Sequence, residues 1–148
     1  MLLTINDYDK SYVIYNEPVD NSVIEQGKFI RLSYSTDVVQ FNAIYILTKF
    51  VNCMCERNYG KYKHSFPVKQ NSALVNYLST LEHGLLSKSG ISGKTCQYKL
   101  DQSLKDGFLK MFDPSLNGQF VLRISGIWET PQEYGLAYKF IPVKPSVV

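Results

Sequence analysis

The sequence predicts a mainly β or α+β fold, built as a small twisted antiparallel sheet or a partly open barrel with one helix. Most apolar stretches are short, rich in β-branched and aromatic residues, and bounded by turn residues. Residues 72–87 give the clearest repeat of apolar side chains at helical spacing. Strands and helices do not alternate, which argues against a doubly wound parallel sheet. With 148 residues, 45% of them apolar and 20% charged, we expect a single domain over residues 1–148.

The first third of the chain predicts short strands. Residues 11–15 form an apolar run that ends before Asn16 and Pro18, and residues 28–34 form a second run. Residues 38–54 fit either an amphipathic helix or a strand. Because β-branched and aromatic residues dominate the beginning of that segment, we predict a strand over residues 38–48 that pairs with 28–34.

The clearest helix covers residues 72–87, where Asn71 or Ser72 can cap the first turn. Leucines at positions 74, 78, 81 and 85 form its apolar stripe. A loop follows, and residues 95–100 return to a strand pattern. The Asp106-Gly107 pair then predicts a turn before a strand over residues 108–112.

The best-defined strands are residues 119–129 and 134–143, which flank a turn at Pro131 and predict a hairpin. Trp128 shares the predicted apolar face of the hairpin, so we expect it in the core. Seven or eight short strands with one helix fit an OB-like barrel. In that fold, one strand face and the adjoining loops bind oligonucleotides.

The charges are distributed unevenly. Residues 1–56 carry four Lys and Arg against seven acids, whereas residues 57–100 carry seven against Glu82 alone. Within residues 57–64, cations alternate with tyrosines and no acid occurs. Backbone phosphates bind cations, and unpaired bases stack on aromatic rings. The middle third therefore predicts a groove for single-stranded DNA or RNA, although the net charge of +3 is modest.

The candidate binding residues are of two kinds. The cations expected to follow the phosphate backbone are Arg57, Lys61, Lys63, Lys69, Lys88, Lys94 and Lys99, with Arg123 and Lys139 added from the hairpin. Those expected to stack on bases are Tyr59, Tyr62 and Tyr98. Contact with about five phosphates predicts a log–log salt slope of about −3.5. The alternative is a protein-interaction or virion structural module, whose lysines form a solvated face and whose tyrosines are half-buried.

No pattern predicts a catalytic or cofactor site. Cys53 and Cys55 are too close for a structural zinc site, and the other Cys and His residues are isolated. The Gly-Lys-Thr sequence at 93–95 lacks the earlier glycine of a phosphate-binding loop and follows a helix. We therefore expect a protein that is not an enzyme, with no cofactor, no metal and no small-molecule substrate.

The cellular setting follows from the same composition. Three cysteines argue against a disulfide-stapled scaffold and favour a reducing compartment. Neither a signal peptide nor an apolar run of membrane-spanning length is evident. We expect an intracellular protein with no membrane partner.

The second half of the chain resembles a known group of proteins. Residues 122–129 (LRISGIWE) and 134–140 (YGLAYKF), together with 78–86 and 98–100, are similar to a pattern in small proteins of eukaryotic DNA viruses and related self-synthesising DNA transposons. The resemblance implies an OB-like single-stranded DNA-binding protein of viral replication, in the nucleus or cytoplasm. Self-association through an exposed edge strand is a further expectation. The resemblance assigns no individual functional residue.

Overall fold

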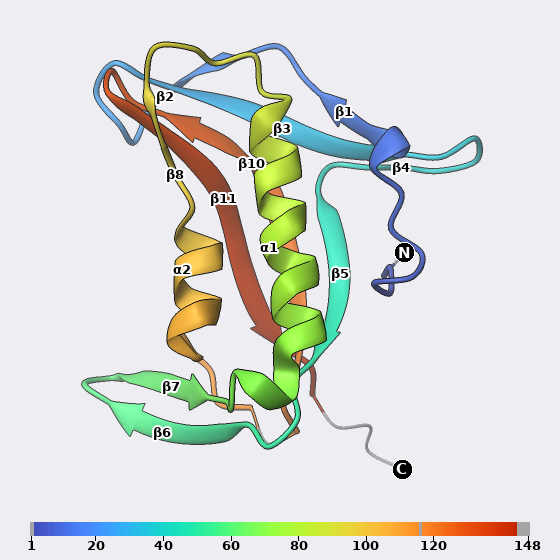
Figure 1. Cartoon of the computed structure of the whole chain (residues 1–148). Coiled ribbons are helices and arrows are strands. Elements are labelled where there is room, and N and C mark those ends of the chain that lie inside the picture. The colour runs from blue at the N-terminus through green and yellow to red at the C-terminus, as the bar shows by residue number, and fades with distance from the viewer. Residues whose placement is uncertain (1, 116, 145–148) are drawn as a thin grey trace.

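The computed structural model describes residues 2–115 and 117–144, and it confirms a mainly β fold with one main helix. An open sheet carries helix α1 on one face, and a smaller sheet lies at the N-terminal end of that helix (Figure 1). The elements are η1 (Lys10–Tyr12), β1 (Val13–Tyr15), β2 (Val19–Asn21), β3 (Gly27–Ser35), β4 (Gln40–Phe41), β5 (Ile44–Lys49), β6 (Met54–Asn58), β7 (Lys61–Ser65), η2 (Lys69–Asn71), α1 (Ser72–Ser87), β8 (Thr95–Gln97), α2 (Lys99–Asp106), β9 (Phe108–Met111), β10 (Gln119–Glu129) and β11 (Glu133–Pro142).

The predicted C-terminal hairpin is confirmed and forms the centre of the main sheet. Strands β10 and β11 pair along nearly their full length, and Phe120, Leu122 and Ile124 alternate into the core. The register shifts between Ile124 and Gly126, which changes the alternation beyond that point. Ile127 is buried as a result, whereas Trp128 is only half-buried, so the prediction of a core tryptophan was wrong.

The sheet is open and mixed. Strand β8 runs parallel to β11, and on the other side of β10 two strands lie end to end: β5 pairs with residues 119–124, and β3 pairs with residues 126–129. Strand β3 also pairs with β1, β2 and β4. Because β3 and β5 share one edge of β10, the described strands do not close into a barrel.

The segment over residues 38–54 contains short strands, bends and a turn but no helix, so the helical alternative is wrong. The predicted strand over 38–48 is divided into β4 and β5, and only β4 pairs with β3 as expected. Strand β5 instead pairs with β10, which lies about 70 residues further along the chain. Ile44 and Ile46 become fully buried in that position. The long-range partner therefore determines the position of β5, and no local sequence pattern reveals it.

Helix α1 has the bounds that the leucine repeat predicts. Its leucines are buried, and the chain packs them against the sheet and against α2. No helix in the described residues is both long and apolar enough to cross a bilayer.

Helix α2 was not predicted. Residues 95–100 were expected to be one strand, but the strand ends at Gln97 and a helix begins at Lys99. Two buried leucines, Leu100 and Leu104, form the whole apolar stripe of this short helix. Its first backbone N–H groups donate to Glu82, a buried carboxylate on α1, at 2.8 and 3.0 Å. Burial raises the pKa of Glu82. Helix α2 is thus capped by a residue from another helix, which sequence analysis does not detect.

Candidate nucleic-acid interface

The smaller sheet contains strands β6, β7 and β9, in that order. Lys63 of β7 lies opposite Lys110 of β9, and His64 lies opposite Leu109. Successive side chains of a strand point to opposite faces, and residues directly across from each other point to the same face. The register therefore separates a cationic face of this sheet from an apolar one.

The inner face of the smaller sheet packs on the core. His64, Leu109 and Met111 are buried there. The outer face presents three lysines and two phenylalanines, which we call the lysine–phenylalanine face: Lys61, Lys63, Phe108, Lys110 and Phe112.

The lysines and aromatic rings of this face are in contact. The Nζ atom of Lys63 lies 4.7 Å from the centroid of the Phe108 ring, and that of Lys110 lies 5.7 Å from the same ring. The Nζ atom of Lys61 lies 5.3 Å from the centroid of the ring of Phe112, a residue that is 73% exposed. Cation–π attraction holds the ammonium groups beside rings that remain accessible. The face thus offers positive charge and exposed aromatic surface within one small area.

The charge of this face is not neutralised by ion pairs. In the described residues, ion pairs form only between Lys94 and Glu129 and between Lys105 and Asp101. Glu56 lies opposite Lys63 in the register and therefore adds one acid to the same side of the sheet, but it makes no ion pair with Lys63. The three lysines therefore remain available to an anionic ligand.

Two hollows adjoin the lysine–phenylalanine face. One, of about 240 Å³, is lined by all three lysines together with Asn58 and Tyr59. The other, of about 730 Å³, lies between β9 and β11 and is lined by both phenylalanines, Lys110 and Lys139, with Asp113 as the one acid. Lys110 borders both hollows, so they adjoin along the same strand.

The structure brings some of the predicted residues together. Lys61 and Lys63 share the face, and Tyr59 lies fully exposed at the β6–β7 turn beside them. Lys139 borders the larger hollow. Arg57 and Tyr62 pair with each other across β6 and β7, and their register assigns them to the opposite face of the sheet.

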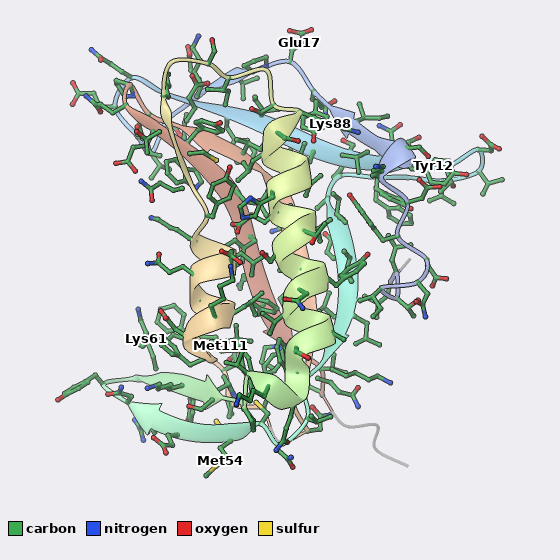
Figure 2. All side chains as sticks on the ribbon, in the orientation of Figure 1. Tyr12, Glu17, Met54, Lys61, Lys88 and Met111 are labelled. Carbon is green, nitrogen blue, oxygen red and sulfur yellow. The ribbon has the colours of Figure 1, made fainter. Side chains whose placement is uncertain are left out.

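The remaining predicted residues lie elsewhere, so the twelve do not form one cleft. Lys88 follows the C-terminal end of α1, and Figure 2 shows it and Lys61 near opposite ends of the molecule. Lys69 is exposed in η2, next to the start of α1. Lys94 is paired with Glu129 and also donates to the carbonyl of Thr130.

Tyr98, Lys99 and Arg123 are engaged by other side chains. The Tyr98 ring stacks on His83 at 3.8 Å, which occupies one of its faces. The Nζ atom of Lys99 lies 5.3 Å from the Trp128 ring. Arg123 lies in the main sheet, where its Nε donates to the Tyr45 hydroxyl.

Three members of the face were not predicted: Phe108, Lys110 and Phe112. They lie outside both the basic middle third and the C-terminal hairpin, from which all the candidate cations came. The signal was nevertheless present, because in residues 108–112 Phe, Lys and Phe alternate with Leu and Met. That alternation places Phe108, Lys110 and Phe112 on one side of a strand and Leu109 and Met111 on the other.

The described residues contain no group of three or more His, Cys, Asp or Glu that could hold a metal ion. Cys53, Cys55 and Cys96 are free thiols. What the described side chains of the face offer is positive charge and aromatic surface.

His64 supports the inner face of the smaller sheet. Its Nε2 lies 3.1 Å from the carbonyl oxygen of Asp113, so this nitrogen carries the proton. Its Nδ1 is buried with no hydrogen-bond partner in the described structure. A second proton would place an unpaired charge in the core, and burial accordingly lowers the pKa of His64 below 6.5.

We expect this histidine to make the protein less stable in mild acid. Below pH 6.5 the unfolded chain binds a proton at this position and the folded chain does not, so the free energy of unfolding falls as the pH decreases. The loss is at most about 1.4 kcal/mol per pH unit. Urea unfolding from about pH 7.5 to about pH 5.5 measures it. His64→Gln keeps a donor for Asp113 but cannot titrate, so the free energy of unfolding of this variant should depend less steeply on pH. An unchanged pH dependence would show that His64 is not the group responsible.

Comparison of the chain with protein-family models, with curated proteins and with solved structures gives no match. The fold and the residues of the lysine–phenylalanine face are therefore the evidence for the function of the chain.

Proposed function

We propose that this protein binds single-stranded nucleic acid, with DNA as the expected form, on the lysine–phenylalanine face. The supporting observation is that three lysines without ion-pair partners in the described residues project beside two aromatic rings from one face of β7 and β9. Phosphates bind ammonium groups, and any base can stack on a phenylalanine ring. Binding of this kind tolerates different sequences and requires no catalysis.

The two hollows support a path for the strand. The smaller one accommodates the phosphates near Lys61, Lys63 and Lys110, and the exposed Tyr59 offers a further ring at its edge. The larger one extends the positive surface to Lys139. Together with the resemblance of the second half of the chain, this arrangement is the basis for proposing a role in viral-type DNA replication inside the cell.

Titration of a fluorescent oligothymidylate of about 16 nucleotides at several salt concentrations tests the proposal. Three phosphate contacts give a log–log slope of about −2, smaller than the value expected for a longer groove. An oligouridylate of the same length distinguishes DNA from RNA. Absence of saturable binding, or affinity that does not change with salt, would instead favour a protein-interaction module that uses the exposed Phe112.

A further inference from the structure

A separate cleft lies between the N-terminal segment and the C-terminal half of α1. Its volume is about 550 Å³, within the range of small-molecule sites. One wall contains Tyr8 and Tyr15, and the other contains Tyr77, Leu81 and Gly84 of α1. The smaller sheet lies at the other end of this helix (Figure 1), so the cleft is independent of the proposed nucleic-acid interface.

Gly84 is unusual in its position. It lies inside α1, where glycine is less favourable than alanine by about 1 kcal/mol. A Cβ atom at this position would have no atom within 4 Å, so no packing within the chain requires glycine. The missing side chain instead leaves space on the wall of the cleft. A bound molecule would account for a residue that the helix itself does not favour.

The tyrosines provide the second observation. The hydroxyl of Tyr15 donates to the carbonyl of Leu85, which fixes the wall against the helix. The hydroxyl of Tyr77 is buried and has no partner in the described residues. Burial raises the pKa of Tyr8 and of Tyr77, so both phenols stay protonated and act as donors. Buried donors of this kind are normally satisfied, by protein, water or ligand.

The charges of the cleft indicate what it can hold. Asp7 and Asp9 accept hydrogen bonds from Thr4 and from Ser11 within their own turns. The lining also contains Lys10 and Lys88, so its formal charges cancel. A lining that carries two acids and two lysines beside its phenols and leucines has no net charge and favours neither an anion nor a cation.

We propose that this cleft binds a neutral small molecule of one or two aromatic rings with a hydrogen-bond acceptor. Tyr8, Tyr15 and Tyr77 would contact the rings, and Gly84 would allow them to approach the helix backbone. Such a ligand is not among the partners expected from the sequence.

The test uses two fluorescent probes that differ by one charged group. 6-Propionyl-2-dimethylaminonaphthalene is neutral and has two fused rings with a ketone acceptor, and 6-dimethylamino-2-naphthoate has the same rings with a carboxylate in place of the ketone. We expect saturable binding of the neutral probe, one molecule per chain, and weaker binding of the carboxylate at this cleft. Gly84→Leu fills the space and should weaken binding of the neutral probe at least about tenfold. Amide resonances of Gly84 and Leu85 should shift on titration, whereas that of Gly60 should not.

Two further variants keep the result decisive. Thr80→Leu fills the same cleft one turn earlier and should also weaken binding. Gly84→Ala adds one methyl group, should keep the binding, and should raise the Tm by about 2–4 °C because alanine is the better helix former. Unchanged affinity in both leucine variants, or absence of saturable binding to the wild-type protein, would overturn the proposal. Neither outcome bears on the binding of oligonucleotides.

Discussion

Replacing Lys61, Lys63 and Lys110 together by glutamine is expected to weaken binding of oligothymidylate about 50-fold at 0.15 M salt. This factor follows from counterion release. Three phosphate contacts make the affinity fall with about the second power of the salt concentration, so these contacts strengthen binding about 50-fold at 0.15 M salt relative to 1 M salt. The rings of Phe108 and Phe112 remain, so residual stacking should leave weak binding that changes little with salt. Fluorescence titration across salt concentrations measures both effects.

A charge-matched variant separates this surface from the charge of the whole molecule. Lys10, Lys28 and Lys49 are exposed and lie outside the smaller sheet, and their replacement by glutamine removes the same number of charges. We expect this control to change affinity by much less than the first variant. Equal losses in the two variants would mean that binding depends on overall charge, and the proposed interface would be incorrect.

Replacing Gly126 by alanine is expected to lower the free energy of unfolding by about 3 kcal/mol or more. A Cβ atom at this position would lie 2.2 Å from the carbonyl oxygen of Ile30 and 2.5 Å from Cζ of Phe29. Ile30 belongs to β3, which pairs with β10 at this point. The backbone oxygen cannot move without breaking the pairing between these strands, so the strain is not relieved by a change of rotamer.

Urea unfolding measures this effect, and Gly84→Ala is the matched control. Both variants add one methyl group, but the methyl group at position 84 meets no neighbouring atom and lies in a helix. We expect the control to be as stable as the wild type or more stable by up to about 1 kcal/mol. Complete loss of the folding transition in Gly126→Ala would be the extreme form of the expected result. A wild-type midpoint would show that β3 and β10 are not as close as described.

The sequence predicted those elements whose pattern is local. The leucine stripe of α1 repeats over at least three turns, and the alternation in the C-terminal hairpin repeats over at least three residue pairs. Both elements were confirmed. Where the partner is distant, the prediction failed in part. Strand β5 was assigned to β3 but pairs with β10, and α2 depends on Glu82, which lies 17 residues before its first residue.

The candidate site shows the same division. Lys61 and Lys63 could be predicted as binding residues because cations and tyrosines alternate within residues 57–64. Pairing of β7 with β9 decided that Lys110 and its two phenylalanines join them. Folding likewise separated Lys88, Lys94 and Lys99, which the same count of charges had grouped with the others.

The amino-acid sequence alone therefore determined the type of those elements that have a local repeat, such as α1 and the β10–β11 hairpin, and the side chains that can bind an anion or stack on a base. Only the tertiary structure decided which of those side chains share a face. The physical reason is that periodicity and composition act within one segment, whereas strand pairing joins segments whose separation along the chain carries no information about their register.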